Sequence, residues 1–163
     1  LGADFSCRCA VFHVILLQPE IPPNTGNIMR LCANTGCQLH LVKPLGFSLD
    51  DRRMRRAGLD YREWADVAVH EQLDDCLAQI PGQIWAATTK ATRHYHDIAY
   101  EPGDAFLFGP ETTGLPESLL ASLGPERLLR IPMRPFSRSL NLSNSVAVMI
   151  YEGLRQQGFP DCR

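Results

Sequence analysis

The chain has 163 residues, the size of one domain with its own core, and its 45% hydrophobic and 21% charged residues exclude a disordered tail, a coiled coil or a collagen-like polymer. Sixteen Lys plus Arg against eighteen Asp plus Glu give a formal charge of -2, so no chain-wide basic field exists to hold nucleic acid nonspecifically, and any anion site must be local. Fourteen of the sixteen cations are arginines, a bias that suits forked contacts to phosphate but that a G+C-rich genome would also produce.

Short apolar runs alternate with helical patterns along the chain. Strands that are buried on both faces read as continuous apolar runs, and six segments fit this description: Phe12–Leu17, Leu39–Val42, Val67–Val69, Ile84–Thr88, Ala105–Phe108 and Leu128–Ile131. The alternation predicts an α/β domain with a mostly parallel sheet flanked by helices. Residues 11–163 are expected to form this single domain, and residues 1–10 an unstructured leader.

Helices are predicted between the strands and at the C-terminal end. In the first helix Asn24 or Thr25 is expected to be the N-cap and Gly36 the C-terminal stop. A 3.6-residue period places Ile28, Leu31 and Cys32 on one face, which is expected to pack on the core. The opposite face then carries Asn27, Arg30 and Asn34. The other predicted helices are Asp50–Ala57, Leu73–Gln79, Pro116–Leu123 and a last helix that has Ser143 or Asn144 as its cap and buries Val146, Met149, Ile150 and Leu154.

No stretch predicts a membrane span. The longest clean apolar run, Val14–Leu17, is far shorter than the ~20 residues that a span requires. The six cysteines are interpreted as reduced, which predicts a soluble, cytoplasmic protein. Because the Cys7-x-Cys9 and Cys32-x4-Cys37 pairs lack zinc-site spacing and His94-x-His96 is typical of solvated histidines, no metal is expected.

Three unusual loops follow the first, fifth and sixth predicted strands, at the strand ends where α/β proteins collect ligands. The first loop, 22–30, enters a helix N-terminus, where free N–H groups attract anions. The second loop, 108–116, carries two glycines that permit close backbone approach and Glu111 as its only carboxylate. The third loop, 131–144, ends in a run of small polar residues. Each loop alone fits a turn or a cap, but three together in one short chain indicate a ligand site.

The sequence lacks the familiar nucleotide-binding and hydrolase motifs, and it has one dense cluster of basic residues. The sequence contains neither G-x-G-x-x-G, nor G-x-x-x-x-G-K-[ST], nor G-x-S-x-G. Arg52, Arg53, Arg55 and Arg56 either neutralise several phosphates or form a solvated helix face that pairs with nearby aspartates. A hydrolase with Glu111 as base would need a second acid or a metal, and neither occurs at a suitable spacing.

The three loops resemble, in order and spacing, the three motifs of the SPOUT RNA methyltransferases. The matching segments are Asn24–Arg30, Phe108–Pro116, and Ile131–Met133 with Ser139–Asn144, and the similarity extends from Phe12 to about Pro160. The Gln18–Asn24 opening, the Arg56–Tyr61 segment and the lack of an appended RNA-binding domain are most similar to the small bacterial branch that methylates the wobble ribose of tRNA.

The resemblance implies a C-terminal deep trefoil knot, a homodimer whose partner chain completes each site, tRNA as substrate, S-adenosylmethionine as cofactor and no metal. Carried over motif by motif, it implies that the cofactor is held largely by backbone groups and apolar contacts at Ala87, Thr88, Gly109, Ile131, Met133, Ser139 and Leu140.

The resemblance also implies roles in catalysis and RNA binding. Arg30 is expected to hold the phosphate or ribose oxygen and to stabilise developing alkoxide charge, because its guanidinium stays protonated and cannot act as a base. Asn27, Ser139 and Asn141 would orient the hydroxyl, while Glu111 would fix the second loop. The arginines expected to contact RNA are Arg30, Arg52, Arg53, Arg55, Arg56 and Arg138. The preference between cytidine and uridine stays open, as do a different tRNA or rRNA ribose and a noncatalytic RNA-binding module.

Overall fold

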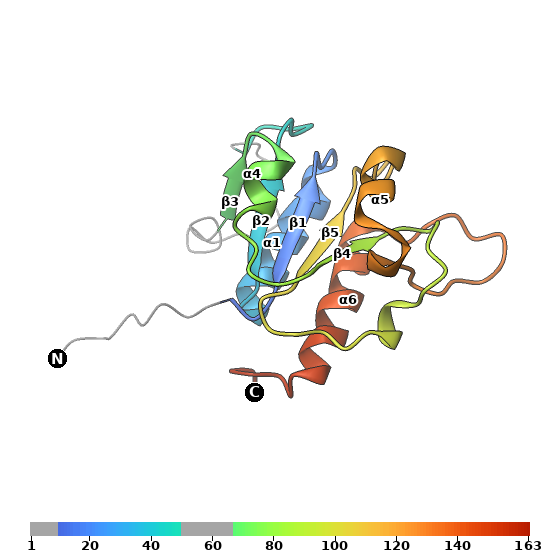
Figure 1. Cartoon of the computed structure of the whole chain (residues 1–163). Coiled ribbons are helices and arrows are strands. Elements are labelled where there is room, and N and C mark those ends of the chain that lie inside the picture. The colour runs from blue at the N-terminus through green and yellow to red at the C-terminus, as the bar shows by residue number, and fades with distance from the viewer. Residues whose placement is uncertain (1–9, 50–66) are drawn as a thin grey trace.

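A parallel β-sheet with helices on both faces organises the chain (Figure 1). The computed structural model describes residues 10–49 and 67–163. Within them the sheet has six strands, all pairing in parallel in the order β3-β2-β1-β5-β4-β6. The strands are β1 His13–Leu17, β2 Gln38–Val42, β3 Val67–His70, β4 Ile84–Ala87, β5 Ala105–Phe108 and β6 Leu128–Leu129. The predicted α/β class is therefore confirmed.

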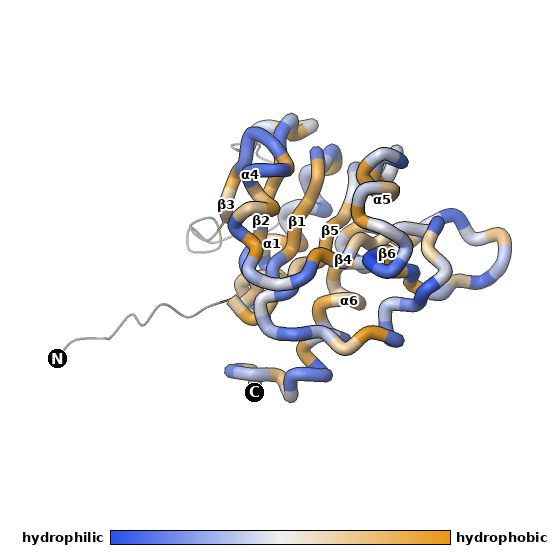
Figure 2. The backbone as a smooth tube through the Cα atoms, viewed as in Figure 1, coloured by the Kyte–Doolittle hydropathy of each residue, from blue (hydrophilic) through white to orange (hydrophobic). Residues whose placement is uncertain are grey.

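The central strands are buried on both sides, which is why their sequences are continuously apolar. Every residue of β5 is buried, and in β1 only His13 is partly exposed. Figure 2 shows the hydrophobic residues concentrated on these strands. The last strand is shorter than the predicted Leu128–Ile131, because Arg130 forms only an isolated bridge with His94 and the chain then turns away from the sheet edge.

Two long helices cover one face of the sheet, and two short ones cover the other (Figure 1). Helices α1 (Pro22–Thr35) and α6 (Leu142–Gln156) contact each other and enclose a core that includes Ile28, Met29 and Val146. Helices α4 (Leu73–Leu77) and α5 (Glu117–Leu123) enclose the second core with Cys76 and Leu120. Single 3-10 turns occur at Tyr95–Asp97 and Pro125–Arg127. None of the helices within the described ranges has both the length and the apolar character needed to cross a membrane.

The helix ends differ from the predictions at two caps. Helix α1 begins at Pro22 with Ile21 as N-cap, so the predicted caps Asn24 and Thr25 lie inside the helix. Proline suits the first turn because its missing N–H would be unbonded there. In α6 the cap is Asn141, whose Oδ1 accepts hydrogen bonds from the backbone N–H groups of residues 143 and 144. The stop at Gly36, with φ of 73°, is confirmed.

The remaining helix predictions agree closely where they can be compared. Helix α4 ends two residues before the predicted Gln79, and α5 begins one residue after the predicted Pro116. The predicted helix Asp50–Ala57 and the cluster Arg52, Arg53, Arg55 and Arg56 lie outside the described residues.

Three histidines form a hydrogen-bonded row across β1, β2 and β3. His13 Nδ1 lies 2.9 Å from His40 Nε2, and His40 Nδ1 lies 3.0 Å from His70 Nε2. His40 and His70 are both buried. Burial, together with the neighbouring imidazoles of His13 and His70, lowers the pKa of His40 from its usual 6.5 to about 4. The folded protein therefore holds His40 in its neutral form.

This neutral histidine makes the stability of the protein sensitive to acid. Because the unfolded chain takes up a proton on His40 near pH 6.5 and the folded chain only near pH 4, stability is lost as the pH falls through this range. We expect His40 to account for a loss of about 2 kcal/mol in the free energy of unfolding between pH 7 and pH 5. Urea unfolding of the unchanged protein and of His40→Gln at both pH values measures this, with the exposed His96→Gln as control. Equal pH dependence in the unchanged protein and His40→Gln would contradict the expectation.

Candidate functional site

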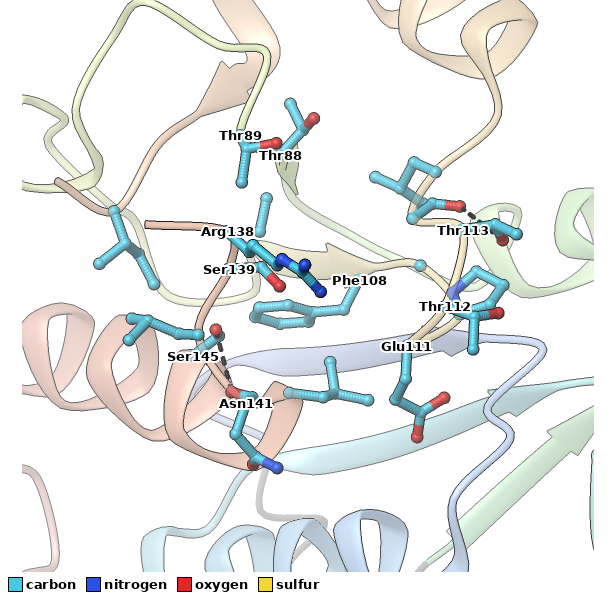
Figure 3. Close-up of a pocket in the computed structure, with 18 of the residues that line it drawn as sticks. Thr88, Thr89, Phe108, Glu111, Thr112, Thr113, Arg138, Ser139, Asn141 and Ser145 are labelled. Atoms are coloured by element: carbon cyan, nitrogen blue, oxygen red, sulfur yellow. Dashed lines mark hydrogen bonds between the residues drawn. The ribbon is translucent and has the colours of Figure 1, made fainter. Parts of the chain in front are cut away.

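A pocket of about 620 Å³ lies at the carboxyl ends of β4, β5 and β6 (Figure 3). Its walls come from four segments that are far apart in sequence. The lining residues are Ala87–Lys90 after β4, Phe108–Leu115 after β5, Leu129–Ile131 with Met133 and Arg138–Leu142 after β6, and Ile21 and Asn24 at the start of α1, together with Ser145. The second and third loops predicted from the sequence thus share one cavity, and the first loop contributes its beginning.

Every residue predicted to bind the cofactor lines this pocket. These residues are Ala87, Thr88, Gly109, Ile131, Met133, Ser139 and Leu140. They come from three strand ends that the sheet order places side by side, because β4 lies between β5 and β6. Figure 3 shows Thr88, Arg138 and Ser139 around the same space as Phe108.

The second loop folds back tightly on itself at Gly109. A Cβ atom placed there would lie 2.4 Å from both the carbonyl carbon of Gly114 and the backbone nitrogen of Leu115. Gly114 itself has φ of 68°, a left-handed conformation that favours glycine. The two glycines therefore allow the loop after β5 to close into one wall of the pocket.

Glu111 ties this second loop to the start of α1. Its Oε2 accepts a hydrogen bond from the Glu20 N–H at 2.7 Å, and its Oε1 accepts bonds from the Ile21 N–H at 3.1 Å and from Asn24 Nδ2 at 3.4 Å. In return, the hydroxyl of Thr112 donates to the Glu20 carboxylate at 2.7 Å. A carboxylate is favourable at a helix N-terminus, where unbonded N–H groups leave partial positive charge. With both oxygens engaged, Glu111 is suited to bracing and not to proton abstraction.

Removing the Glu111 carboxylate should loosen this brace. We expect Glu111→Ala to lower the free energy of unfolding by about 1 to 2 kcal/mol, because two backbone N–H groups lose a charged acceptor. Urea denaturation measures the change, and Glu101→Ala, at an exposed carboxylate, serves as control. A Glu111→Ala protein as stable as the Glu101→Ala control would show that these hydrogen bonds add nothing.

Asn141 connects the third loop to the first. Its Oδ1 caps α6, and its Nδ2 donates to Asn24 Oδ1 at 3.0 Å. The backbone carbonyl of Asn141 also accepts a hydrogen bond from the Ser145 hydroxyl at 3.1 Å (Figure 3). Glu111, Asn24 and Asn141 thus form a polar chain that joins all three loops. The sequence reasoning placed Asn141 in the site and Asn24 in the first motif, but gave Asn24 only the role of a helix cap and missed its link to the other two loops.

The predicted catalytic and RNA-binding residues that the structure describes fall into two groups. The pocket is lined by Arg138, Ser139 and Asn141. In contrast, Asn27 and Arg30 lie exposed on α1 and are not among the residues that line the pocket. The sequence reasoning also missed the cations Lys90 and Arg130. Arg130 directly follows β6 and Lys90 lies three residues after the end of β4, and these positions near strand ends were the available signal. Lys90 Nζ forms an ion pair with Glu117.

Comparison with known proteins finds RNA methyltransferases. Residues 11–151 match the SpoU rRNA methylase family. A tRNA (cytidine(34)-2'-O)-methyltransferase from Methylovorus glucosotrophus is 57% identical over 150 residues, which cover 91% of this chain and 97% of the relative.

Solved structures agree in fold as well as in sequence. One that concerns 2-OH methylation of C/U34 on tRNA has a TM-score of 0.83 and 40% identity, with 90% of this chain and 96% of that chain covered. An AdoMet-bound rRNA methyltransferase from Sinorhizobium meliloti has a TM-score of 0.76 and 25% identity, with 88% of this chain and 56% of that chain covered.

Proposed function

The chain belongs to the SpoU methylase family, as its three motifs predicted, and on that premise we propose that it is a tRNA 2'-O-methyltransferase. Its substrate is the ribose of the wobble nucleotide, cytidine or uridine 34, in the anticodon loop, and S-adenosylmethionine is the methyl donor. The observation that carries this proposal is the pocket, in which the second and third motif loops meet and the first is joined to them through Glu111 and Asn141. The relatives with the corresponding names support the choice of nucleotide.

The pocket suits the proposed cofactor in size and in chemistry. Its volume of about 620 Å³ lies within the range of roughly 300–1,000 Å³ typical of small-molecule sites. Backbone groups at Gly109 and Ile131 can bind an adenosine moiety, and Leu140 and Met133 offer apolar contact. S-adenosylmethionine supplies a methyl group made electrophilic by its bond to a sulfonium.

The side chains of the protein supply alignment and charge stabilisation. Alignment of reacting groups contributes up to roughly 7 to 11 kcal/mol in favourable cases. Arg30 holds the ribose or phosphate oxygen and stabilises the negative charge that develops as the 2'-hydroxyl loses its proton. Ser139, at the pocket, and Asn27, three residues before Arg30 on α1, orient that hydroxyl. Asn141 holds the third loop against Asn24 through the hydrogen bond described above.

We further propose that residues 11–163 form one domain with the trefoil knot of the family it resembles, and that the protein acts on tRNA in the cytoplasm as a homodimer. Arg30 does not line the pocket of its own chain, which the start of α1 borders only at Ile21 and Asn24. In a homodimer, Arg30 of one chain would act at the pocket of the partner chain. A partner chain would bury exposed apolar side chains at Ile21, the N-cap of α1, at Leu140 on the third loop and at Tyr151 on α6.

Mass spectrometry of tRNA nucleosides tests the proposed reaction. Unmodified tRNA is incubated with the protein and S-adenosylmethionine, digested, and compared with a reaction that lacks protein. We expect a 2'-O-methylated cytidine or uridine that maps to position 34 after ribonuclease fragmentation. A methylated ribose at another position would replace the proposed substrate, and tRNA binding without S-adenosylmethionine binding and without any methylated nucleoside would favour a noncatalytic RNA-binding module.

The basic cluster offers a separate test of RNA binding. We expect replacement of Arg52, Arg53, Arg55 and Arg56 by Ala to weaken tRNA binding and to reduce the slope of log K against log salt by about 1 for each phosphate that these arginines neutralise. Filter binding or fluorescence anisotropy over a salt series measures this slope, with Arg155→Ala on α6 as control. An unaltered slope would show that the cluster is a solvated surface.

A further inference from the structure

A second group of reactive side chains lies on the opposite half of the sheet from the pocket. His40 on β2, His70 at the end of β3 and Cys76 in α4 are all buried, with 3%, 7% and 0% of their surfaces exposed. Helix α4 packs against both β2 and β3, which brings these residues together although they span 36 positions of the chain. Among the residues described, they share no position with the pocket lining.

The three side chains bring their potential ligand atoms close to one another. One ligand atom from each, an imidazole nitrogen or the thiol sulfur, lies within 4.8 Å of the other two. His40 Nδ1 and His70 Nε2 are 3.0 Å apart. Two nitrogens bound to one tetrahedral zinc ion at about 2.05 Å are about 3.4 Å apart, so the rings need to separate by only a few tenths of an ångström. We propose that His40, His70 and Cys76 form a zinc-binding site.

The donor set explains the choice of ion. Two imidazoles and one thiolate suit a borderline ion such as Zn²⁺ better than the hard ions Mg²⁺ or Ca²⁺, which prefer oxygen. Cys76 belongs to the second core, which also contains the apolar residues Ile15, Leu17 and Val42. A water molecule can complete the tetrahedron as the fourth ligand.

His13 supports the proposed site from the next strand. Its Nδ1 lies 2.9 Å from His40 Nε2, so with His40 Nδ1 on the metal the Nε2–H of His40 donates to His13. Such an outer hydrogen bond fixes the tautomer and the orientation of a metal-bound imidazole. Binding breaks the S–H bond of Cys76 and releases that proton to solvent, while the imidazoles stay neutral and no electrons are transferred. The net charge of the metal and its ligands is +1.

Titration with Co²⁺, a spectroscopic substitute for Zn²⁺, tests the proposal on the purified protein. We expect one Co²⁺ per chain, a thiolate-to-cobalt charge-transfer band in the near ultraviolet, and loss of that band when Zn²⁺ is added. Cys76→Ala and Cys76→Ser should both lose the band, whereas Cys32→Ala, at a buried cysteine of the other core, should keep it. His13→Ala should weaken Co²⁺ binding by about 10- to 100-fold.

The outcomes separate this site from others in the chain. Cobalt bound without a thiolate band would place the ion at the exposed group His94, His96 and Asp97 and overturn the proposal. A band that survives in both Cys76 variants would also overturn it, by assigning the ligand to another cysteine. Circular dichroism shows whether Cys76→Ala folds, and if it does not, Cys76→Ser takes its place. In addition, Zn²⁺ should raise the Tm of the unchanged protein but not that of Cys76→Ser, and an equal rise in both would overturn the proposal.

Discussion

Arg30→Ala should lose most of its methyltransferase turnover while keeping its affinity for S-adenosylmethionine. Arg30 lies on the exposed face of α1, outside the described lining of the pocket that suits the cofactor. Its proposed role is to stabilise charge on the ribose oxygen, and removing one such donor from an active site costs roughly 100- to 1,000-fold in kcat. Single-turnover methylation of tRNA measures the rate, and calorimetry measures cofactor affinity.

A neighbour on the same helix face provides the matched control. Asn34 is one helical turn beyond Arg30 and is also exposed, so Asn34→Ala changes the same surface without removing the proposed catalytic group. We expect nearly unchanged turnover in this control. Arg30→Lys should regain only part of the lost rate, because an ammonium lacks the planar fork of a guanidinium. Full turnover in Arg30→Ala would remove Arg30 from the mechanism.

Gly109→Ala should strongly weaken cofactor binding, because the added methyl group takes the space that the backbone of the second loop occupies. The added Cβ would lie 2.4 Å from the backbone of Gly114 and Leu115, closer than a Cβ approaches backbone atoms, so the whole loop has to move. We expect the Kd for S-adenosylmethionine to rise at least about 100-fold, equivalent to roughly 2.7 kcal/mol. Overpacking of this kind should also lower the free energy of unfolding by about 1 to 3 kcal/mol.

A glycine in the core separates these two effects. In Gly153→Ala the new Cβ would lie 2.8 Å from Cε2 of Phe12, a crowded position that is not part of the described pocket lining. This variant should lose stability but keep its affinity for S-adenosylmethionine. Calorimetry and thermal unfolding of both variants make the comparison. Normal cofactor affinity in Gly109→Ala would show that the second loop does not shape the binding site.

The first-loop helix illustrates where sequence reasoning succeeded and where it failed. The core face of α1, with Ile28 and Cys32, followed from its 3.6-residue period, because burial of one helix face is a local pattern. The role of Asn24 did not follow. Its amide bonds to Glu111 and Asn141, which are 87 and 117 residues away in the chain. A polar residue near a helix start therefore resembled a cap when its partners were in other loops.

The buried histidines show the same limit in the core. His40 interrupts the apolar pattern of its strand, and the sequence offers no sign that His13 and His70 lie beside it. Their row depends on β2 lying between β1 and β3. The spacing of 30 and 36 residues from His40 to His70 and Cys76 is likewise outside any short metal-binding motif.

The sequence by itself determined the strands, the α/β class and the family. Apolar runs of this length favour burial on both faces, as in β1 and β5, whereas Val69 of the edge strand β3 is 39% exposed, contrary to the prediction for that run. The small polar loops that carry the family motifs follow such runs in the sequence itself. Only the tertiary structure decided the sheet order β3-β2-β1-β5-β4-β6, which brings the ends of β4, β5 and β6 around one pocket and lets Glu111 brace α1. The physical reason is that strand order depends on contacts between segments far apart in the chain, and local periodicity contains no information about which strands are neighbours.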